Sequence, residues 1–291
     1  MSRAHVATPA EFSALRDLEL VVRATVEGLR QGLHRSPFHG YSAEFSQYRH
    51  YRPGDDLKHV DWKAFGRTDR LFTRQFRETT NMAALFVVDL SRSMDYDGKF
   101  ALAQAVTATL GTLVIDQGDA AGLLAARADG TARLAARSGH PQLRQLLAAV
   151  ARLRPDQDVS IVEGLARAGV LLKRRGVVVA VSDFYEDEAA LVQLRRLARM
   201  GHDVLVVQTL AEGEVRLWLD DAAELVDAES GRSLVVQPAV AREAYARRVD
   251  SWLAGFESAV RRDGLDYLRV LTGQSLPLAL RRLLVRRRGA A

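Results

Sequence analysis

Two groups of oxygen-bearing side chains have the types and spacing needed for metal chemistry. Asp89, Ser91 and Ser93 form an Asp-x-Ser-x-Ser string, and Asp183 ends a second apolar run further along the chain. Carboxylate and hydroxyl oxygens are hard ligands suited to Mg²⁺ or Mn²⁺. Two carboxylates with neutral hydroxyls leave the metal incompletely neutralised. An acidic side chain from a partner would therefore be attracted to an open metal position.

The Asp-x-Ser-x-Ser string by itself has a simpler interpretation. Serine and aspartate both suit the turn after a strand, and either can cap the helix that follows. Its position favours the metal site, because the apolar run 83–89 ends at Asp89 and the run 177–182 ends just before Asp183. Ligands of doubly wound sheets bind outside the carboxyl ends of the strands.

The surrounding elements alternate between strand and helix, which predicts an α/β fold with a doubly wound, mostly parallel sheet. The apolar runs have the composition of buried parallel strands. Asp129-Gly130 predicts a hairpin between runs 120–126 and 131–137. The predicted strands are 83–89, 120–126, 131–137, 177–182, 203–209 and 265–271, and the helices are 99–115, 141–153, 161–174, 187–200, 239–262 and 276–287.

Two further regions complete the predicted organisation. Residues 1–80 are expected to form an N-terminal wrap, made of a helix over 11–33 and a segment of irregular structure and short strands packed on the core. Residues 81–291 form the α/β domain, with a small β-hairpin insertion at about 212–237.

Both motifs carry a resemblance to known families. The string FVVDLSRSMDYDGKFALAQA resembles the metal-ion-dependent adhesion site of von Willebrand A domains, and VVVAVSDF resembles the second aspartate-bearing strand of that Rossmann-type fold. The segment EFSQYRHYRPGDDLKHVDWKAFGRTDRLFTRQF is similar to the signature of the bacterial domain-of-unknown-function 58 family. The resemblance implies a protein-binding adaptor that works with a MoxR-type AAA+ ATPase in assembling or activating other proteins.

One position departs from the adhesion-site pattern. Such sites draw a threonine from the loop before the helix that precedes the second aspartate strand, and Val159 stands at that place here. Ser160, beside it, supplies the hydroxyl if the loop shifts by one residue; otherwise the site is incomplete. The expected metal ligands are therefore Asp89, Ser91, Ser93, Asp183 and Ser160.

The signature segment and the C-terminal tail each have two interpretations. Charges of both signs alternate with aromatic residues between Arg49 and Arg67, which suits a docking surface. A charge-paired wrap with Trp62 as a buried anchor is the alternative that we favour, and Pro53-Gly54-Asp55 predicts a turn within it. The arginines near the C-terminus suit nucleic acid or acidic lipid, but cations also complement a helix C-terminus.

Composition limits the remaining possibilities. The 291 residues are 48% hydrophobic, which is enough for one sizeable core. The net charge of +5 indicates a mildly basic surface, and the absence of cysteine excludes disulfides and thiolate chemistry. The N-terminal sequence lacks the pattern of a signal peptide, and no apolar run is long enough to span a membrane. A cytoplasmic location is expected.

Three classes of function are compatible with these sequence features. The expected one is a non-enzymatic, metal-dependent binding module. A metal-dependent phosphoryl hydrolase is the alternative, although Asp89 is followed two places later by Ser91 rather than by a second aspartate. The sequence has no Gly-x-Ser-x-Gly elbow and no phosphate-binding glycine loop. Nucleic-acid binding has no motif in its support.

Overall fold

The computed structural model describes residues 9–30, 43–52, 60–78, 82–127, 130–155, 159–185, 187–217, 221–226 and 232–289. The chain divides into two compact units. The larger unit comprises residues 1–37 and 82–291, and the smaller unit comprises residues 38–81. The N-terminal helix α1 (Pro9–Arg30) therefore belongs to the larger unit, whereas the predicted division grouped it with the signature segment.

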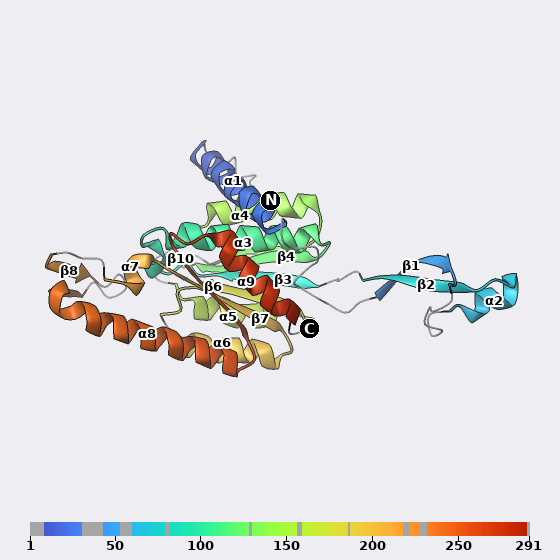
Figure 1. The fold of residues 1–291 in the computed structure, drawn as a ribbon. Coiled ribbons are helices and arrows are strands. Elements are labelled where there is room, and N and C mark those ends of the chain that lie inside the picture. Colours follow the sequence, from blue (N-terminus) through green and yellow to red (C-terminus); the bar gives the residue numbers. More distant parts are fainter. Residues whose placement is uncertain are drawn as a thin grey trace. The chain divides into compact units, whose positions relative to one another are not determined.

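A six-stranded sheet forms the centre of the larger unit (Figure 1). Its order is β10-β7-β6-β3-β4-β5. The strands are β3 (Ala83–Val88), β4 (Ala120–Arg127), β5 (Gly130–Arg137), β6 (Val177–Ser182), β7 (Asp203–Leu210) and β10 (Asp266–Leu271). All neighbours are parallel except the edge pair β4 and β5. In chain order within this sheet the strands run 3-2-1-4-5-6, which is a doubly wound order and agrees with the doubly wound, mostly parallel sheet predicted from the sequence.

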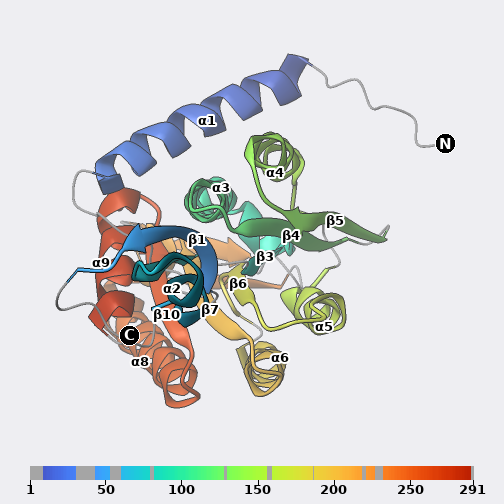
Figure 2. The same cartoon turned by 90° about the vertical axis from the view of Figure 1, so that its right-hand side faces the viewer.

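Helices cover both faces of this sheet (Figure 2). The helices α3 and α4 lie on one face and α5 and α6 on the other, while α8 and α9 flank β10. Helix α1 contacts α3, α4 and α9. The bounds are α3 (Lys99–Asp116), α4 (His140–Arg152), α5 (Ile161–Leu171), α6 (Asp187–Arg199), α8 (Pro238–Arg262) and α9 (Leu276–Gly289).

The central strands are buried on both faces because nearly all of their side chains are apolar. Every residue of β6, with sequence VVVAVS, is buried, and β3, with sequence AALFVV, is buried after its first residue. Such runs must lie between two layers of helices, since either face would otherwise expose apolar surface to water. This placement brings the carboxyl ends of both strands to the same edge of the sheet.

Three short elements follow the strands of the larger unit. A 3₁₀ turn, η2 (Arg92–Asp95), lies between β3 and α3, and a one-turn helix, α7 (Glu212–Val215), comes after β7. The predicted insertion contains the antiparallel hairpin of β8 (Ala223–Val226) and β9 (Ser233–Val236). Among the residues with defined positions, no helix combines the length and the apolar character required to cross a bilayer.

The smaller unit contains an antiparallel pair, β1 (Ala43–His50) and β2 (Phe72–Glu78), with α2 (Trp62–Thr68) between them in sequence. Trp62 is 59% exposed, so the fold of this unit does not bury the side chain that the sequence suggested as an anchor. Its ring meets that of Phe65 edge to face, and Phe65 is exposed too. The predicted turn at Pro53-Gly54-Asp55 lies outside the described residues.

Candidate functional site

Asp89 and Asp183 each follow the last residue of a strand, and the two strands are parallel neighbours in the sheet. The order in which strands are added to the sheet reverses between these two strands. Asp89 comes directly after β3, and Asp183 comes directly after β6, which pairs with β3. The backbone N–H of Asp89 donates to the carbonyl of Val181 at 2.9 Å, which joins the two strand ends. Doubly wound sheets bind their ligands in the crevice at this switch point.

The carboxylate of Asp89 is buried and held at both oxygens. The N–H of Ser91 donates to Oδ1 at 2.9 Å, and the hydroxyl of Ser182 donates to Oδ2 at 2.5 Å. Burial, and next the nearby charge of Asp183, raise the pKa of Asp89 to about 7, against the opposing effect of these hydrogen bonds. Asp89 is therefore a buried acid lying close to a second carboxylate.

The two serines of the Asp-x-Ser-x-Ser string bring their hydroxyls together. Ser91 Oγ and Ser93 Oγ lie 3.1 Å apart. Adjacent ligands of an octahedral Mg²⁺ with metal–oxygen distances of about 2.1 Å are separated by about 3 Å, so this spacing suits two neighbouring ligands of one ion. Ser93 lies in η2, the short turn that carries the chain from β3 toward α3.

Asp183 has an internal cation beside it, which the sequence analysis did not anticipate. Lys99 Nζ lies 2.9 Å from Asp183 Oδ2 and 2.6 Å from Glu214 Oε1, and the lysine side chain is fully buried. The other oxygen, Asp183 Oδ1, accepts the N–H of Tyr185 at 3.3 Å. Lys99 is the first residue of α3 and Glu214 lies in α7, so the ion pairs join three separate elements at this edge.

Ser182 and Phe184 hold the second carboxylate in place. Ser182 Oγ accepts the N–H of Phe184 at 2.9 Å while donating to Asp89. Phe184 is fully buried, stacks on Phe256 and has a φ of 58°. A bulky residue in the left-handed region is strained and persists only where the surrounding packing enforces it. This strain lies directly beside Asp183, as is common at functional sites.

The fifth expected ligand has a structural role in the same region. Ser160 precedes the first turn of α5, and its hydroxyl accepts the N–H of Val162 at 3.1 Å as a helix cap. Val159, at the position where related sites have threonine, is buried and brings no oxygen. The role of Ser160 as a ligand stays a prediction.

The donor set fits a small divalent cation at the Asp89 side of the site. Over the described ranges, no group of three or more histidine or acidic side chains gathers in a way that would hold a metal. The candidate set instead combines Asp89 with the two serine hydroxyls, with Asp183 close by. The three carboxylates Asp89, Asp183 and Glu214 against the ammonium of Lys99 leave two negative charges, which a divalent ion would balance.

Features of the sequence pointed to Lys99 and Glu214, the two residues of the site that were not predicted. A lysine at the first position of an apolar helix opposes the helix dipole, which favours acidic residues there. Lys99 occupies that position, and such a placement indicates a nearby carboxylate partner. Glu214 follows β7 at the same edge of the sheet as the two aspartates.

Comparison with solved structures found chains of limited similarity. The conserved hypothetical protein BatB from Bacteroides thetaiotaomicron is 14% identical, with 72% of this chain and 99% of that chain covered and a TM-score of 0.44. The SpRpn10 VWA domain is 12% identical, with coverage of 70% and 94% and a TM-score of 0.42. An aerotolerance-related membrane protein from Bacteroides fragilis is 14% identical, with coverage of 72% and 100% and a TM-score of 0.43.

Sequence comparison gave full-length relatives. Uncharacterized proteins of Mycobacterium bovis and Mycobacterium tuberculosis are 31% identical over 301 residues, which cover 100% of this chain and 94% of each relative. Residues 47–252 match the family described as "Protein of unknown function DUF58", in agreement with the resemblance of the signature segment. The chain therefore belongs to the DUF58 family.

Proposed function

We propose that this chain is a non-enzymatic protein-binding module that docks an acidic side chain of its partner at the Asp89–Asp183 edge of the sheet. The observation that carries the proposal is the convergence of Asp89, Ser91 and Ser93 beside Asp183 at the switch point. Mg²⁺ or Mn²⁺ held there would offer an open coordination position to a carboxylate.

The protein's own residues have distinct parts in this proposal. Asp89, with both oxygens hydrogen-bonded, orients the loop that presents the two serine hydroxyls. Lys99 holds Asp183 in place and neutralises part of its charge, while Glu214 holds the lysine ammonium group. The family resemblance makes a MoxR-type AAA+ ATPase the first partner to test.

Thermal unfolding in Mg²⁺, in Mn²⁺ and in EDTA tests metal binding directly. A cation that binds the folded state alone stabilises it by about 2.7 kcal/mol at a hundred times its dissociation constant. We expect either ion to raise the melting temperature, and we expect Asp89→Ala and Ser93→Ala to remove this rise. Glu19→Ala, which removes an exposed carboxylate on α1, should keep the rise in melting temperature.

No change of the melting temperature with either ion in the wild type would contradict metal binding. A rise that then appears in Val159→Thr would identify Val159 as the cause.

Partner docking needs its own measurement. A partner co-purified from the native host should bind more weakly in EDTA and to Ser91→Ala. If docking instead uses the exposed ring of Trp62 in the smaller unit, Trp62→Ala should weaken binding while EDTA has no effect. Turnover of a phosphoester that depends on Asp89 would contradict the non-enzymatic part of the proposal.

A further inference from the structure

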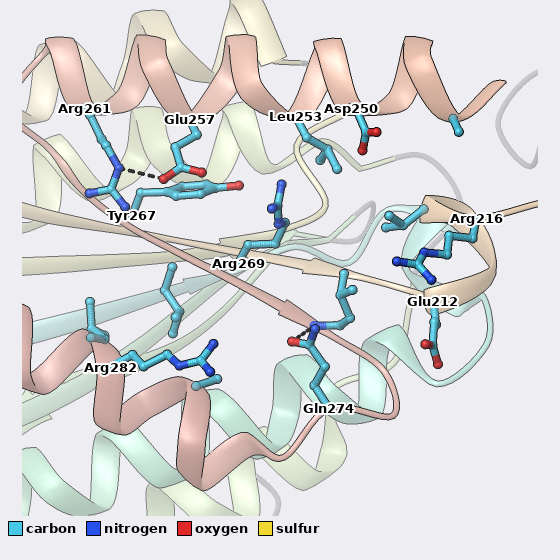
Figure 3. Close-up of a pocket in the computed structure, with 16 residues that line it drawn as sticks. Glu212, Arg216, Asp250, Leu253, Glu257, Arg261, Tyr267, Arg269, Gln274 and Arg282 are labelled. Carbon is cyan, nitrogen blue, oxygen red and sulfur yellow. Dashed lines mark hydrogen bonds and ion pairs between the residues drawn. The ribbon is translucent and has the colours of Figure 1, made fainter. Parts of the chain in front are cut away.

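A groove of about 590 Å³ runs along the free edge of β10 (Figure 3). Helix α8 lies on one side of the groove and α9 on the other, and α7 lies at one end. Tyr267 and Leu268, whose side chains point to opposite faces of the sheet, both line it. The groove therefore wraps around the strand edge and is not confined to one face of the sheet.

The backbone of β10 is available for pairing on this side. Within the described part of the chain, β10 has one hydrogen-bonded neighbour, β7. The N–H of Thr272, just beyond β10, donates to the carbonyl of Leu210 at the end of β7, whereas the N–H of Leu271 points the other way and reaches Gln274 Oε1 at 3.4 Å. Because bonding direction alternates along a parallel strand, Tyr267 and Arg269 also direct their backbone groups toward the groove.

The length of the groove suits an extended peptide. Its α8 wall consists of side chains three or four positions apart, from Ala246 to Arg261. The fifteen steps along the helix from Ala246 to Arg261 rise about 22 Å, at 1.5 Å per residue. An extended chain rises about 3.3 Å per residue, so six or seven residues would fill this length.

The charges of the groove favour an acidic peptide. Arg269 lies on the α8 side of the strand edge and Arg282 projects from α9 on the opposite side (Figure 3). At the left end Arg261 is paired with Glu257, and at the α7 end the lining includes both Arg216 and the acidic residues Glu212 and Asp250. Adjacent side chains of a strand point to opposite faces of a sheet. Two neighbouring acidic residues of an added strand would therefore face one arginine each, Arg269 on one side of the edge and Arg282 on the other.

We propose that this groove binds an extended acidic segment of a partner protein, which adds to β10 as a seventh strand of the main sheet. Backbone hydrogen bonds to the strand edge would supply affinity, and Arg269 and Arg282 would select an Asp-Glu pair. The groove ends at α7, which also carries Glu214, but Asp89, Ser91, Ser93 and Asp183 do not line it, so the proposal stands whether or not that edge binds metal.

The test uses the full chain and the peptide acetyl-Val-Thr-Asp-Glu-Val-Thr-amide. Amide resonances followed by NMR should show shifts and slower hydrogen exchange at Tyr267, Arg269 and Leu271 when the peptide is added. Arg269→Glu with Arg282→Glu should weaken binding by about tenfold or more, as expected for lost charge-assisted bonds. Arg282→Glu alone, on an exposed helix position, gives the same test without disturbing β10.

Controls separate strand addition from simple anion binding. Arg262→Glu with Arg281→Glu changes the same helices outside the groove lining and should leave peptide binding at the wild-type level. A peptide with Lys-Lys in place of Asp-Glu, or with proline at its centre, should bind at least tenfold more weakly, by about 1.4 kcal/mol. Equal binding of either peptide, no binding of the acidic peptide, or the same amide shifts with inorganic phosphate would overturn the proposal.

Discussion

At the scale of single residues, Lys99 is the most consequential side chain of the candidate site. It is fully buried, and its ammonium group lies between Asp183 and Glu214. We expect Lys99→Met to lower the free energy of unfolding by about 3–5 kcal/mol, because two carboxylates lose their buried cation. Chemical denaturation measures this loss, and adding Asp183→Asn and Glu214→Gln to the variant should recover part of it.

An exposed ion pair provides the matched control for Lys99. Arg167 and Glu163 pair across one turn of α5 in contact with solvent. Solvent-exposed pairs of this kind contribute less than about 1 kcal/mol, so Arg167→Met should change stability little. A loss in Lys99→Met no larger than that in Arg167→Met would show that the buried ion pairs do not stabilise the fold.

A second residue makes stability depend on pH. His202 is buried, and among the residues with defined positions its Nδ1 has no hydrogen-bond partner. Burial lowers the pKa of His202 in the folded protein, so the unfolded chain, with a pKa near 6.5, binds the proton more readily. The contribution of His202 to stability should therefore fall as the pH drops through about 6.5 toward the lower folded-state pKa, while Asp89, whose folded-state pKa is raised, contributes in the opposite direction.

The comparison is between unfolding free energies at pH 7.5 and at pH 5.5. His202→Gln should lose less stability over this interval than the wild type, because it no longer takes up that proton. His140, exposed at the start of α4, gives the control His140→Gln, which should keep the wild-type slope. Equal slopes in all three proteins would mean that His202 does not contribute.

At the scale of elements, the β4–β5 edge depends on a glycine. A Cβ atom on Gly122 would lie 2.8 Å from both Ala136 N and Leu134 O, where the strand register shifts. We expect Gly122→Ala to destabilise the protein by about 1–3 kcal/mol, since backbone atoms must move to make room. Gly255, inside α8, has open space around it, and Gly255→Ala should stabilise by about 0.5–1 kcal/mol. Thermal melts of both variants test whether Gly122→Ala lowers stability and Gly255→Ala raises it.

At the scale of the whole molecule, α1 forms part of the larger unit although 52 residues, 31–82, separate it from β3 in sequence. Leu29 is 1% exposed at its C-terminal end, whereas Leu20 on the same helix is 64% exposed. Leu29→Ala should therefore cost about 2–5 kcal/mol, and Leu20→Ala should change stability by less than about 0.5 kcal/mol. Equal effects in denaturant titrations would mean that α1 does not pack on the core as described.

The sequence by itself determined the order of elements and the edge at which the aspartates lie. The run that becomes β3 is apolar at every position and the run that becomes β6 is apolar up to Ser182, which is the pattern of central strands buried between helices. The segments between the strands have helical periodicity, so a doubly wound, mostly parallel sheet was predictable. Asp89 and Asp183, each at the end of such a strand, then had to lie at the carboxyl edge.

The tertiary structure alone decided how the site is completed. Lys99 meets carboxylates 84 and 115 positions away, and no local pattern specifies which buried charge finds which partner. Trp62 is exposed although its type suggested an anchor, because burial depends on what packs against a residue and not on its hydrophobicity alone. Periodicity describes one element at a time, whereas a buried ion pair or a groove beside β10 arises only when several elements are packed together.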